Sequence, residues 1–268
     1  MCRLYGFIAN EPTKVDCSLV FSQNALMMQS RIDETGRNHA DGWGITTYQQ
    51  GMPVLTKKAT AAFADQHFSA VAEKAYSTSI VAHVRRATVG EISWENTHPF
   101  ISGKWTFAHN GTVTGFARIR SALEMETVTE LQQQRLGDTD SEQYFLWLLS
   151  RLRSAGLEDW TAANEDQVTD LLGTAVKDLD QRCRQASPDL VPKLNFVLTD
   201  GSAMVYCRWN RSLHMICRRG IYNCEICGIP HIHHHETVNH RAVVVASEPV
   251  TSDHWDEIPN ETVQIVRL

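Results

Sequence analysis

The chain has 268 residues, of which 43% are hydrophobic and 21% are charged, and its formal net charge is −6. This composition is typical of a globular protein with a full core, as one large domain or two small ones. The acidic balance argues against a non-specific nucleic-acid-binding surface, and no apolar run reaches the roughly 18 residues that a membrane-spanning helix needs.

The start of the chain and its cysteines indicate a cytoplasmic protein. The first residues reach Pro12, Lys14 and Asp16 too soon for the apolar stretch of a signal peptide. The seven cysteines are an odd number, which argues against a complete disulfide framework. Thiols in the cytosol stay reduced, and the default role of each cysteine is that of a small buried hydrophobe.

Strand and helix patterns alternate along the first half of the chain. In order, they predict a strand over 3–9 bounded by Asn10 and Pro12, a helix over 19–30, a hairpin over 42–59 with Gln50 and Gly51 at its turn, and a helix over 65–75 with Asp65 near its N-cap. Two buried strands follow, over 79–90 and 104–113, and each runs into a polar end that contains glycine. Such strand ends are common places for chemistry.

The second half begins with helices and returns to strands. It predicts helices over 138–156 and 165–183, a hairpin over 193–209 with Asp200 and Gly201 at its turn, and strands over 213–219, 241–247 and 261–267. This order favours an α+β protein with sheets packed against helices over a parallel βαβ array. Because no linker rich in Pro, Gly or Ser interrupts the chain, we expect one domain over residues 1–268.

Cys2 can be interpreted in two ways, and its position alone favours an ordinary buried strand thiol. If Met1 is removed, however, Cys2 bears a thiol and a free α-amine together. The α-amine has a reference pKa of about 7.7–8.0, so it can act as a base near neutral pH. Such a residue contains both nucleophile and base and needs no histidine.

Two strand ends contain groups that could bind an anionic centre. The motif "HNG" offers the Asn110 side-chain amide and the Gly111 backbone N–H as an oxyanion hole, although Asn-Gly is also the commonest hairpin turn pair. The motif "HVRRATVG" contains two adjacent arginines, of which only one need enter a site. That arginine could clamp a carboxylate, or both could be solvated surface residues.

The motif "DTDSE" begins the predicted helix over 138–156. One of its carboxylates could bind a substrate ammonium group, and its Asp, Thr or Ser side chains could equally cap the helix. We expect both roles, filled by different residues. Taken together, a nucleophile, oxyanion donors, a carboxylate clamp and an ammonium-binding acid describe a site for glutamine or another γ-glutamyl amide.

These motifs resemble those of the class II glutamine amidotransferase domain, one of the N-terminal nucleophile hydrolases. The resemblance rests on Cys2, "DGWG", "HVRRATVG", "NTHPF", "HNG" and "TDSE", which occur in the family's order over about the first half of the chain. Within the family, the chain is most similar to small stand-alone proteins, including relatives that act on γ-glutamyl compounds in ergothioneine synthesis and glutathione breakdown. The resemblance implies a four-layer αββα sandwich.

The resemblance also implies a role for each matching residue. Cys2 would be the nucleophile, and its freed α-amine the general base. The other implied roles are binding of the substrate α-carboxylate by Arg85 with Thr88 nearby, an oxyanion hole formed by Asn110 and Gly111, binding of the α-ammonium group by Asp140, and shaping of the pocket by His98 and "DGWG". The implied reaction passes through a γ-glutamyl thioester, releases glutamate with ammonia or an amine, and needs no metal or other cofactor.

Two alternatives remain open for the role in the cell. Family members linked to a synthetase use the ammonia in a second domain, for which this chain has no room. It would therefore work with a separate ammonia-using or peptidase partner protein, or act simply as a hydrolase. The other class of function is a non-catalytic regulatory or ligand-binding subunit that retains the glutamine pocket, but the complete reactive set favours an enzyme.

One motif departs from the family pattern. The segment "CEICGIPHIHHHE" over 224–236 contains Cys224 and Cys227 at zinc-like spacing, followed by His231 and the run His233, His234 and His235. A structural zinc site is one interpretation, and a His-rich surface loop is the other. We favour the loop, because four ligands within so compact a segment would be strained and short Cys/His runs often mislead.

Overall fold

Two antiparallel β-sheets form the centre of the computed structural model, which describes residues 2–33, 36–221, 223–232 and 239–268. The larger sheet has the strand order β11-β9-β10-β1-β4-β2-β3, and the smaller has the order β12-β8-β7-β6-β5. The strands are β1 (Arg3–Lys14), β2 (Gly42–Gln49), β3 (Met52–Lys58), β4 (Tyr76–Arg85), β5 (Phe100–Ser102), β6 (Trp105–Thr112), β7 (Lys193–Thr199), β8 (Met204–Arg208), β9 (His214–Arg219), β10 (Arg241–Ala246), β11 (Asp256–Glu257) and β12 (Thr262–Val266).

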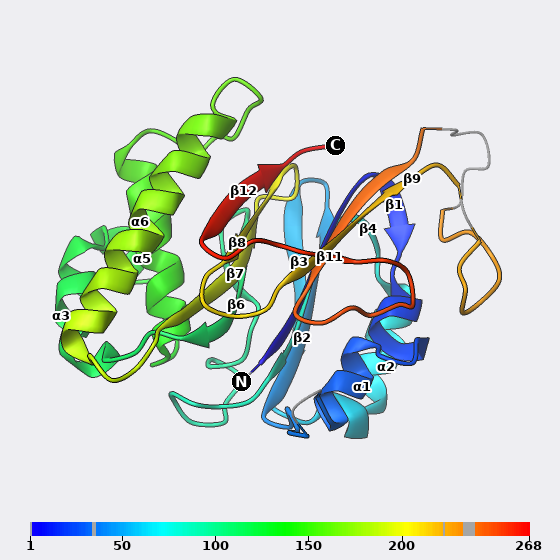
Figure 1. The fold of residues 1–268 in the computed structure, drawn as a ribbon, viewed down its shortest axis with the longest axis horizontal. Coiled ribbons are helices and arrows are strands. Elements are labelled where there is room, and N and C mark those ends of the chain that lie inside the picture. The colour runs from blue at the N-terminus through cyan, green and yellow to red at the C-terminus, as the bar shows by residue number, and fades with distance from the viewer. Residues whose placement is uncertain (1, 34–35, 222, 233–238) are drawn as a thin grey trace.

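Helices cover the outer face of each sheet (Figure 1). They are the π-helical turn η1 (Cys17–Phe21), α1 (Leu26–Arg31), the 3-10 turn η2 (Ala62–Ala64), α2 (Gln66–Lys74), α3 (Phe116–Glu126), α4 (Thr129–Gln132), α5 (Asp140–Ser154) and α6 (Glu165–Ala186). Within the described ranges, no helix is both long enough and apolar enough to cross a bilayer.

Three hydrophobic layers hold these elements together. Trp43 and Phe68 belong to the layer between the larger sheet and the helices α1 and α2. Phe107 and Trp147 belong to the layer between the smaller sheet and the helices α5 and α6. Leu4 lies in the third layer, between the two sheets. This succession of helices, sheet, sheet and helices confirms the predicted α+β class and the αββα sandwich.

The two sheets approach each other closely at Gly6, a glycine of β1. A Cβ atom added to Gly6 would lie 3.0 Å from the Met204 sulfur and 3.0 Å from a methyl group of Val197. Contacts this short would force the side chains apart. The absence of a side chain at this position therefore sets how closely β1 packs on the smaller sheet.

Most predicted elements are confirmed, and three regions differ from the prediction. The predicted strand over 3–9 continues to Lys14, because its register with β4 shifts between Ile8 and Thr13 and so accommodates Pro12. The predicted helix over 19–30 is divided into η1 and α1. Helix α3, which lies between the motifs "HNG" and "TDSE", was not predicted from the sequence.

Candidate active site

Cys2 lies where β1 begins and β4 ends. Arg3 pairs with Val84 in the antiparallel register, so Cys2 is placed beside the last residues of β4. Its sulfur accepts a hydrogen bond from the Arg86 backbone N–H at 3.4 Å and lies 3.5 Å from the Arg86 carbonyl oxygen. The thiol is therefore buried and held by the backbone that follows β4.

The strand register aims Cys2 and Arg85 into the space between the sheets. Leu4 and His83 lie directly opposite each other in the β1–β4 pair, and Leu4 packs in the layer between the sheets. Residues two positions away on a strand share a face. Cys2 and Arg85 therefore point to the same inner side, towards the smaller sheet.

Arg85 is buried and organises the loop that follows it. Its guanidinium group donates to the carbonyl oxygens of Glu91 at 2.9 Å, Val89 at 3.0 Å and Gly90 at 3.4 Å. Burial lowers the pKa of this arginine, and nearby groups that include Cys2 and Asp140 oppose that effect. A permanent positive charge is thus fixed close to both of these predicted site residues.

Asn110 and Gly111 lie inside β6, not at a hairpin turn. Each is paired with a residue of β7, and a Cβ atom on Gly111 would come within 1.8 Å of the Lys193 carbonyl oxygen. The position therefore excludes any side chain. The Asn110 amide nitrogen donates to the Ser247 hydroxyl at 2.7 Å, and the same oxygen accepts from the Leu4 N–H at 2.9 Å. Ser247 thus links Asn110, one of the predicted oxyanion donors, to β1, the strand that follows Cys2.

Asp140 is the first residue of α5, and its carboxylate is buried. It accepts from the Val113 N–H at 2.7 Å and from the Ser141 N–H at 2.9 Å. Capping is done by Thr139, whose hydroxyl accepts from the Glu142 N–H at 3.2 Å. Burial raises the pKa of Asp140, and the neighbouring charge and N–H groups oppose the rise. Thr139 thus fills the expected capping role, and binding of an ammonium group by Asp140 stays a prediction.

Thr88 and His98, the two other predicted site residues, occupy different environments. Thr88 is exposed, and its hydroxyl lies 3.4 Å from that of Thr112, so the two residues connect the ends of β4 and β6. His98 is buried between two rings: it stacks on His83 with ring centroids 4.2 Å apart, and its ring is tilted against that of Phe100 at 4.4 Å. Among the described residues, neither ring nitrogen of His98 has a hydrogen-bond partner. His98 belongs to the packed wall beside β4.

The motif "DGWG" contributes through Asp41. Its carboxylate accepts from the Ala87 N–H at 2.8 Å, and its own N–H donates to the Arg85 carbonyl at 3.0 Å. These bonds fix the backbone on both sides of Arg86, which contacts the Cys2 sulfur. The predicted shaping role of this motif thus has a specific physical basis.

Three residues near Cys2 were not identified from the sequence. The first is Ser247, which bonds to Asn110 and Leu4. Arg3 is buried, donates to the Cys2 carbonyl at 3.1 Å and forms an ion pair with Asp33 at 2.9 Å. The positive charge of Arg211 favours the thiolate form of Cys2. No local pattern in the sequence marks these three positions, because each interacts with residues that are distant along the chain.

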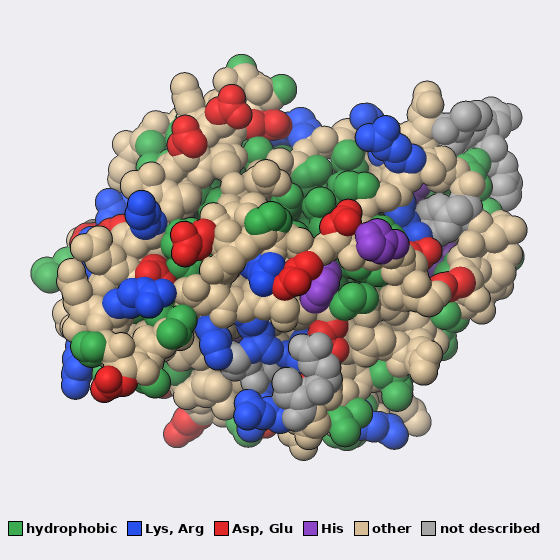
Figure 2. Space-filling model, in the orientation of Figure 1, with side chains coloured by type: hydrophobic (Ala, Val, Ile, Leu, Met, Phe, Trp, Pro, Cys, Tyr) green, Lys and Arg blue, Asp and Glu red, His purple; other side chains and the backbone are tan. Residues whose placement is uncertain are grey.

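The surroundings of the thiol are basic. Burial raises the pKa of Cys2, whereas the Arg86 backbone and the charges of Arg85 and Arg211 lower it. Burial also lowers the pKa of Lys193, and the neighbouring charges of Arg211 and Arg37 lower it further. In Figure 2, Lys and Arg side chains gather below the centre of the face shown, near the end of β1 that Figure 1 marks N. Such a field attracts anionic ligands.

Comparison with known families agrees with this geometry. The family model described as "Glutamine amidotransferases class-II" matches residues 1–267. The chain belongs to the class II glutamine amidotransferases. The predicted family is therefore confirmed over essentially the whole sequence, beyond the first half that contains the motifs.

Several relatives are similar over most or nearly all of their length. The chain is 31% identical to YafJ of Escherichia coli strain K12 over 269 residues, which cover 96% of this chain and 94% of YafJ. It is 28% identical to DUG3 of Saccharomyces cerevisiae, a probable glutamine amidotransferase, over 100% of this chain and 82% of DUG3. It is 25% identical to the gamma-glutamyl-hercynylcysteine sulfoxide hydrolase of Mycolicibacterium smegmatis, over 100% of this chain and 96% of that protein.

Solved structures share the amidotransferase fold. The structure of a glutamine aminotransferase class-II domain protein from Silicibacter pomeroyi superposes with a TM-score of 0.64 at 21% identity, covering 100% of this chain and 95% of that one. A Pseudomonas aeruginosa protein described as a predicted glutamine amidotransferase has a TM-score of 0.62 at 26% identity, covering 99% and 97% of the two chains.

Proposed function

We propose that this class II amidotransferase, as one domain over residues 1–268, hydrolyses the γ-glutamyl amide bond of glutamine or a related γ-glutamyl compound. The observation that carries this proposal is the convergence of Cys2, Arg85, Asn110 and Asp140 at one end of the space between the sheets. The relatives named as gamma-glutamyl-hercynylcysteine sulfoxide hydrolases support hydrolysis of a γ-glutamyl bond in particular.

Two fixed charges would select the α-amino acid head of the substrate. Arg85 would pair with the α-carboxylate, and Thr88 would flank it at the rim. Asp140 would accept from the α-ammonium group, which offsets the burial of that carboxylate. With both ends of the head group held, the γ-carbonyl is directed towards Cys2. His98 would support this pocket by packing behind β4.

The reaction proceeds in two steps once the nitrogen of Cys2 is a free amine, which requires removal of Met1. The thiol attacks the γ-carbonyl carbon and gives its proton to the α-amine. The tetrahedral intermediate collapses as the amine returns that proton to the leaving nitrogen, so ammonia or an amine departs and a thioester remains. Water then attacks the thioester, again with the α-amine as base, and glutamate and the thiol are released.

The oxyanion hole depends on which way the Asn110 amide is turned. With its nitrogen on Ser247, the Asn110 carbonyl oxygen is buried and has no partner among the described residues. In the opposite orientation, the Ser247 hydroxyl donates to that oxygen and still accepts from the Leu4 N–H. This orientation satisfies both groups and frees the amide nitrogen, which can then stabilise the oxyanion together with the Gly111 N–H.

Replacing the nucleophile tests the proposal directly. We expect Cys2→Ala to release no glutamate from L-glutamine or from a panel of γ-glutamyl compounds, because no thioester can form. Cys217→Ser, at an exposed cysteine on β9, is the matched control and should keep full activity. Glutamate release would be measured with a coupled dehydrogenase assay, and intact mass would show whether Met1 is absent.

Covalent labelling separates the two classes of function. An electrophilic glutamine analogue should modify Cys2 alone, as located by peptide mass spectrometry. Activity that survives in Cys2→Ala, or labelling of another cysteine instead, would refute the mechanism. Saturable binding of γ-glutamyl compounds without turnover in protein that lacks Met1 would identify a ligand-binding subunit instead.

A further inference from the structure

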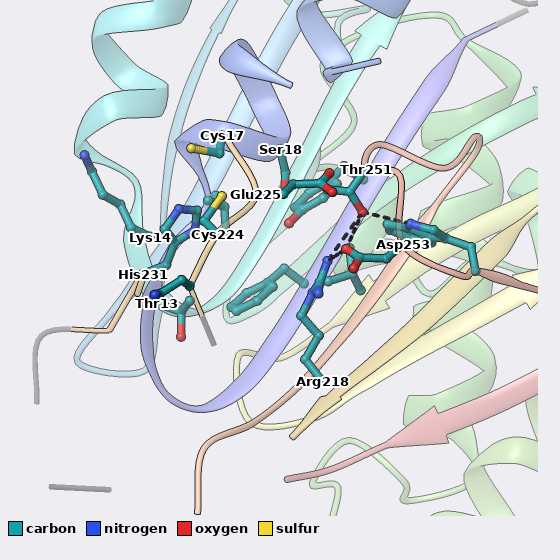
Figure 3. A pocket seen from close by; sticks show the side chains of 16 residues that line it. Thr13, Lys14, Cys17, Ser18, Arg218, Cys224, Glu225, His231, Thr251 and Asp253 are labelled. Carbon is teal, nitrogen blue, oxygen red and sulfur yellow. Dashed lines mark hydrogen bonds and ion pairs between the residues drawn. The ribbon is translucent and has the colours of Figure 1, made fainter. Parts of the chain in front are cut away.

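A second group of reactive side chains lies at the opposite end of β1 from Cys2. Cys17, Cys224, Cys227 and His231 each offer one ligand atom, and these atoms all lie within 4.8 Å of one another. Figure 3 shows Cys17, Cys224 and His231 turned towards each other at one end of a pocket. The two segments concerned are separated by more than 200 residues of chain, so only the fold brings them together.

Cys17 is held in place by the end of β1. It opens the turn η1, and its backbone N–H donates to the Asp16 carboxylate at 3.0 Å. The Lys14 N–H, at the last residue of β1, donates to the His231 carbonyl at 2.9 Å. The end of the strand is thereby fixed to the loop that contains the other three residues.

The backbone of residues 224–229 forms a tight turn around the Cys224 sulfur. The Ile226 N–H donates to that sulfur at 3.4 Å, and the Gly228 N–H donates to the Cys224 carbonyl at 2.9 Å. Gly228 has a φ of 75°, a left-handed conformation that favours glycine. An N–H directed at sulfur stabilises a thiolate, and the turn holds the two thiols of a C-x-x-C pair close together.

The spacing of the four atoms fits a tetrahedral metal ion. With Zn–S bonds of about 2.3 Å, the edges of such a tetrahedron measure about 3.8 Å. The Cys227 sulfur and the His231 Nε2 atom are 3.3 Å apart, and no pair exceeds 4.8 Å. The first distance is shorter than that edge length, and the 4.8 Å limit exceeds it by about 1 Å, so only small side-chain adjustments are needed.

We propose that Cys17, Cys224, Cys227 and His231 bind one zinc ion in a structural site. Three sulfurs and one imidazole are a known ligand set of structural zinc, and they fill all four positions. A disulfide would use only two of the three cysteines and would leave the histidine without a role. The sequence favours a surface loop because four ligands within residues 224–236 would be strained, but the fourth ligand, Cys17, comes from outside that segment and removes this objection. His233, His234 and His235 lie outside the described residues.

The proposed zinc would stabilise the connection between β9 and β10. This connection includes the 224–231 loop, which the metal would tie to the turn after β1. Because Cys2 precedes β1 and Cys17 follows it, the ion would not take part in the chemistry at Cys2. Zinc binding and γ-glutamyl hydrolysis are therefore independent proposals, and each has its own measurement.

Metal content is the first test. The full-length protein, purified without chelator, should contain about one zinc per chain by inductively coupled plasma mass spectrometry. The double variant Cys224→Ala/Cys227→Ala should contain almost none, whereas Cys217→Ser should retain the metal. Zinc retained by the double variant would overturn the proposal, as would wild-type protein without zinc that cannot bind added Zn²⁺.

Spectroscopy of the wild-type protein keeps the test decisive if the variants do not fold. Exchange of zinc for Co²⁺ should produce the intense sulfur-to-metal charge-transfer absorption of thiolate ligands. X-ray absorption should give three sulfurs at about 2.3 Å and one nitrogen at about 2.0–2.1 Å. An oxygen- and nitrogen-only shell would refute the assignment, and so would a disulfide within the cluster that persists in protein given Zn²⁺ and reductant.

Discussion

Ser247 lies outside the sequence motifs, yet its hydroxyl group bonds to residues of both sheets. It bonds to β1 through Leu4 and to β6 through Asn110, so it joins the two sheets beside the proposed nucleophile. In the proposed mechanism it acts as a positioning residue, because it orients the Asn110 amide and does not touch the substrate. Replacing Ser247 should therefore lower kcat less than replacing Asn110, which would contact the oxyanion directly.

At Asn110 we expect a large effect on catalysis and a small effect on binding. Asn110→Ala should lower kcat by about 10²–10³-fold, the usual loss when one oxyanion donor is removed. Ser247→Ala should lower kcat less, with KM nearly unchanged, and Ser247→Thr should restore part of the rate because it keeps the hydroxyl. Steady-state kinetics with L-glutamine would measure these effects, and Ser154→Ala, at the exposed end of α5, is the control. A rise in KM with unchanged kcat would contradict the assigned role.

At the scale of an element, α5 combines a structural cap with a proposed binding group in adjacent residues. Thr139 caps the helix, and Asp140 begins it. The Asp140 carboxylate accepts from the Ser141 N–H in the first turn and from the Val113 N–H just after β6. The central stretch of the helix, from Tyr144 to Leu149, is apolar and buried against the smaller sheet. The position of Asp140 is therefore set by the same interactions that start the helix.

Removing the cap should affect both stability and substrate binding. Thr139→Ala should lower the free energy of unfolding by about 1 kcal/mol, since one N–H of the first turn loses its partner. It should also raise KM, because Asp140 follows directly. Urea unfolding and kinetics would test this, with Thr129→Ala as control, since Thr129 is exposed in the first turn of α4, where no side chain caps the helix. Equal stability of Thr139→Ala and wild type would count against this account of the helix start.

At the scale of the whole molecule, buried histidines make the fold sensitive to acid. Burial lowers the pKa of both His39 and His83 to about 3. Their unfolded pKa is about 6.5, so between these values the unfolded chain binds protons that the folded protein does not. The stability contributed by neutral His39 and His83 is complete above about pH 6.5 and is lost as the pH falls towards about 3.

This acid sensitivity can be measured by unfolding at several pH values. Each histidine should add about 1.4 kcal/mol per pH unit to the slope of unfolding free energy below about pH 6. His83→Gln should reduce that slope, while His254→Gln should not, because the side chain of His254 is 92% exposed. An unchanged slope in folded His83→Gln would show that His83 becomes protonated in the native state.

Features that depend on neighbouring residues could be predicted from the amino-acid sequence alone. Gln50 and Gly51 form the predicted hairpin turn, both with positive φ, and Asp65 caps α2 as expected. Periodicity identified α5 and α6, and the order of motifs identified the family. These features rest on local hydrogen bonds, turn conformations and apolar spacing, which are readable from a short stretch of chain.

The roles of residues whose partners lie far along the chain could be identified only from the three-dimensional structure. The Asn110-Gly111 pair has a strong turn propensity, yet it lies within β6, where Gly111 has no room for a side chain beside Lys193. Ser247 and Cys17 have no distinctive local pattern, and they gain their roles from groups far along the chain. Packing of the two sheets brings Asn110 to Ser247. The loop between β9 and β10 folds against the end of β1 and so brings Cys224, Cys227 and His231 to Cys17.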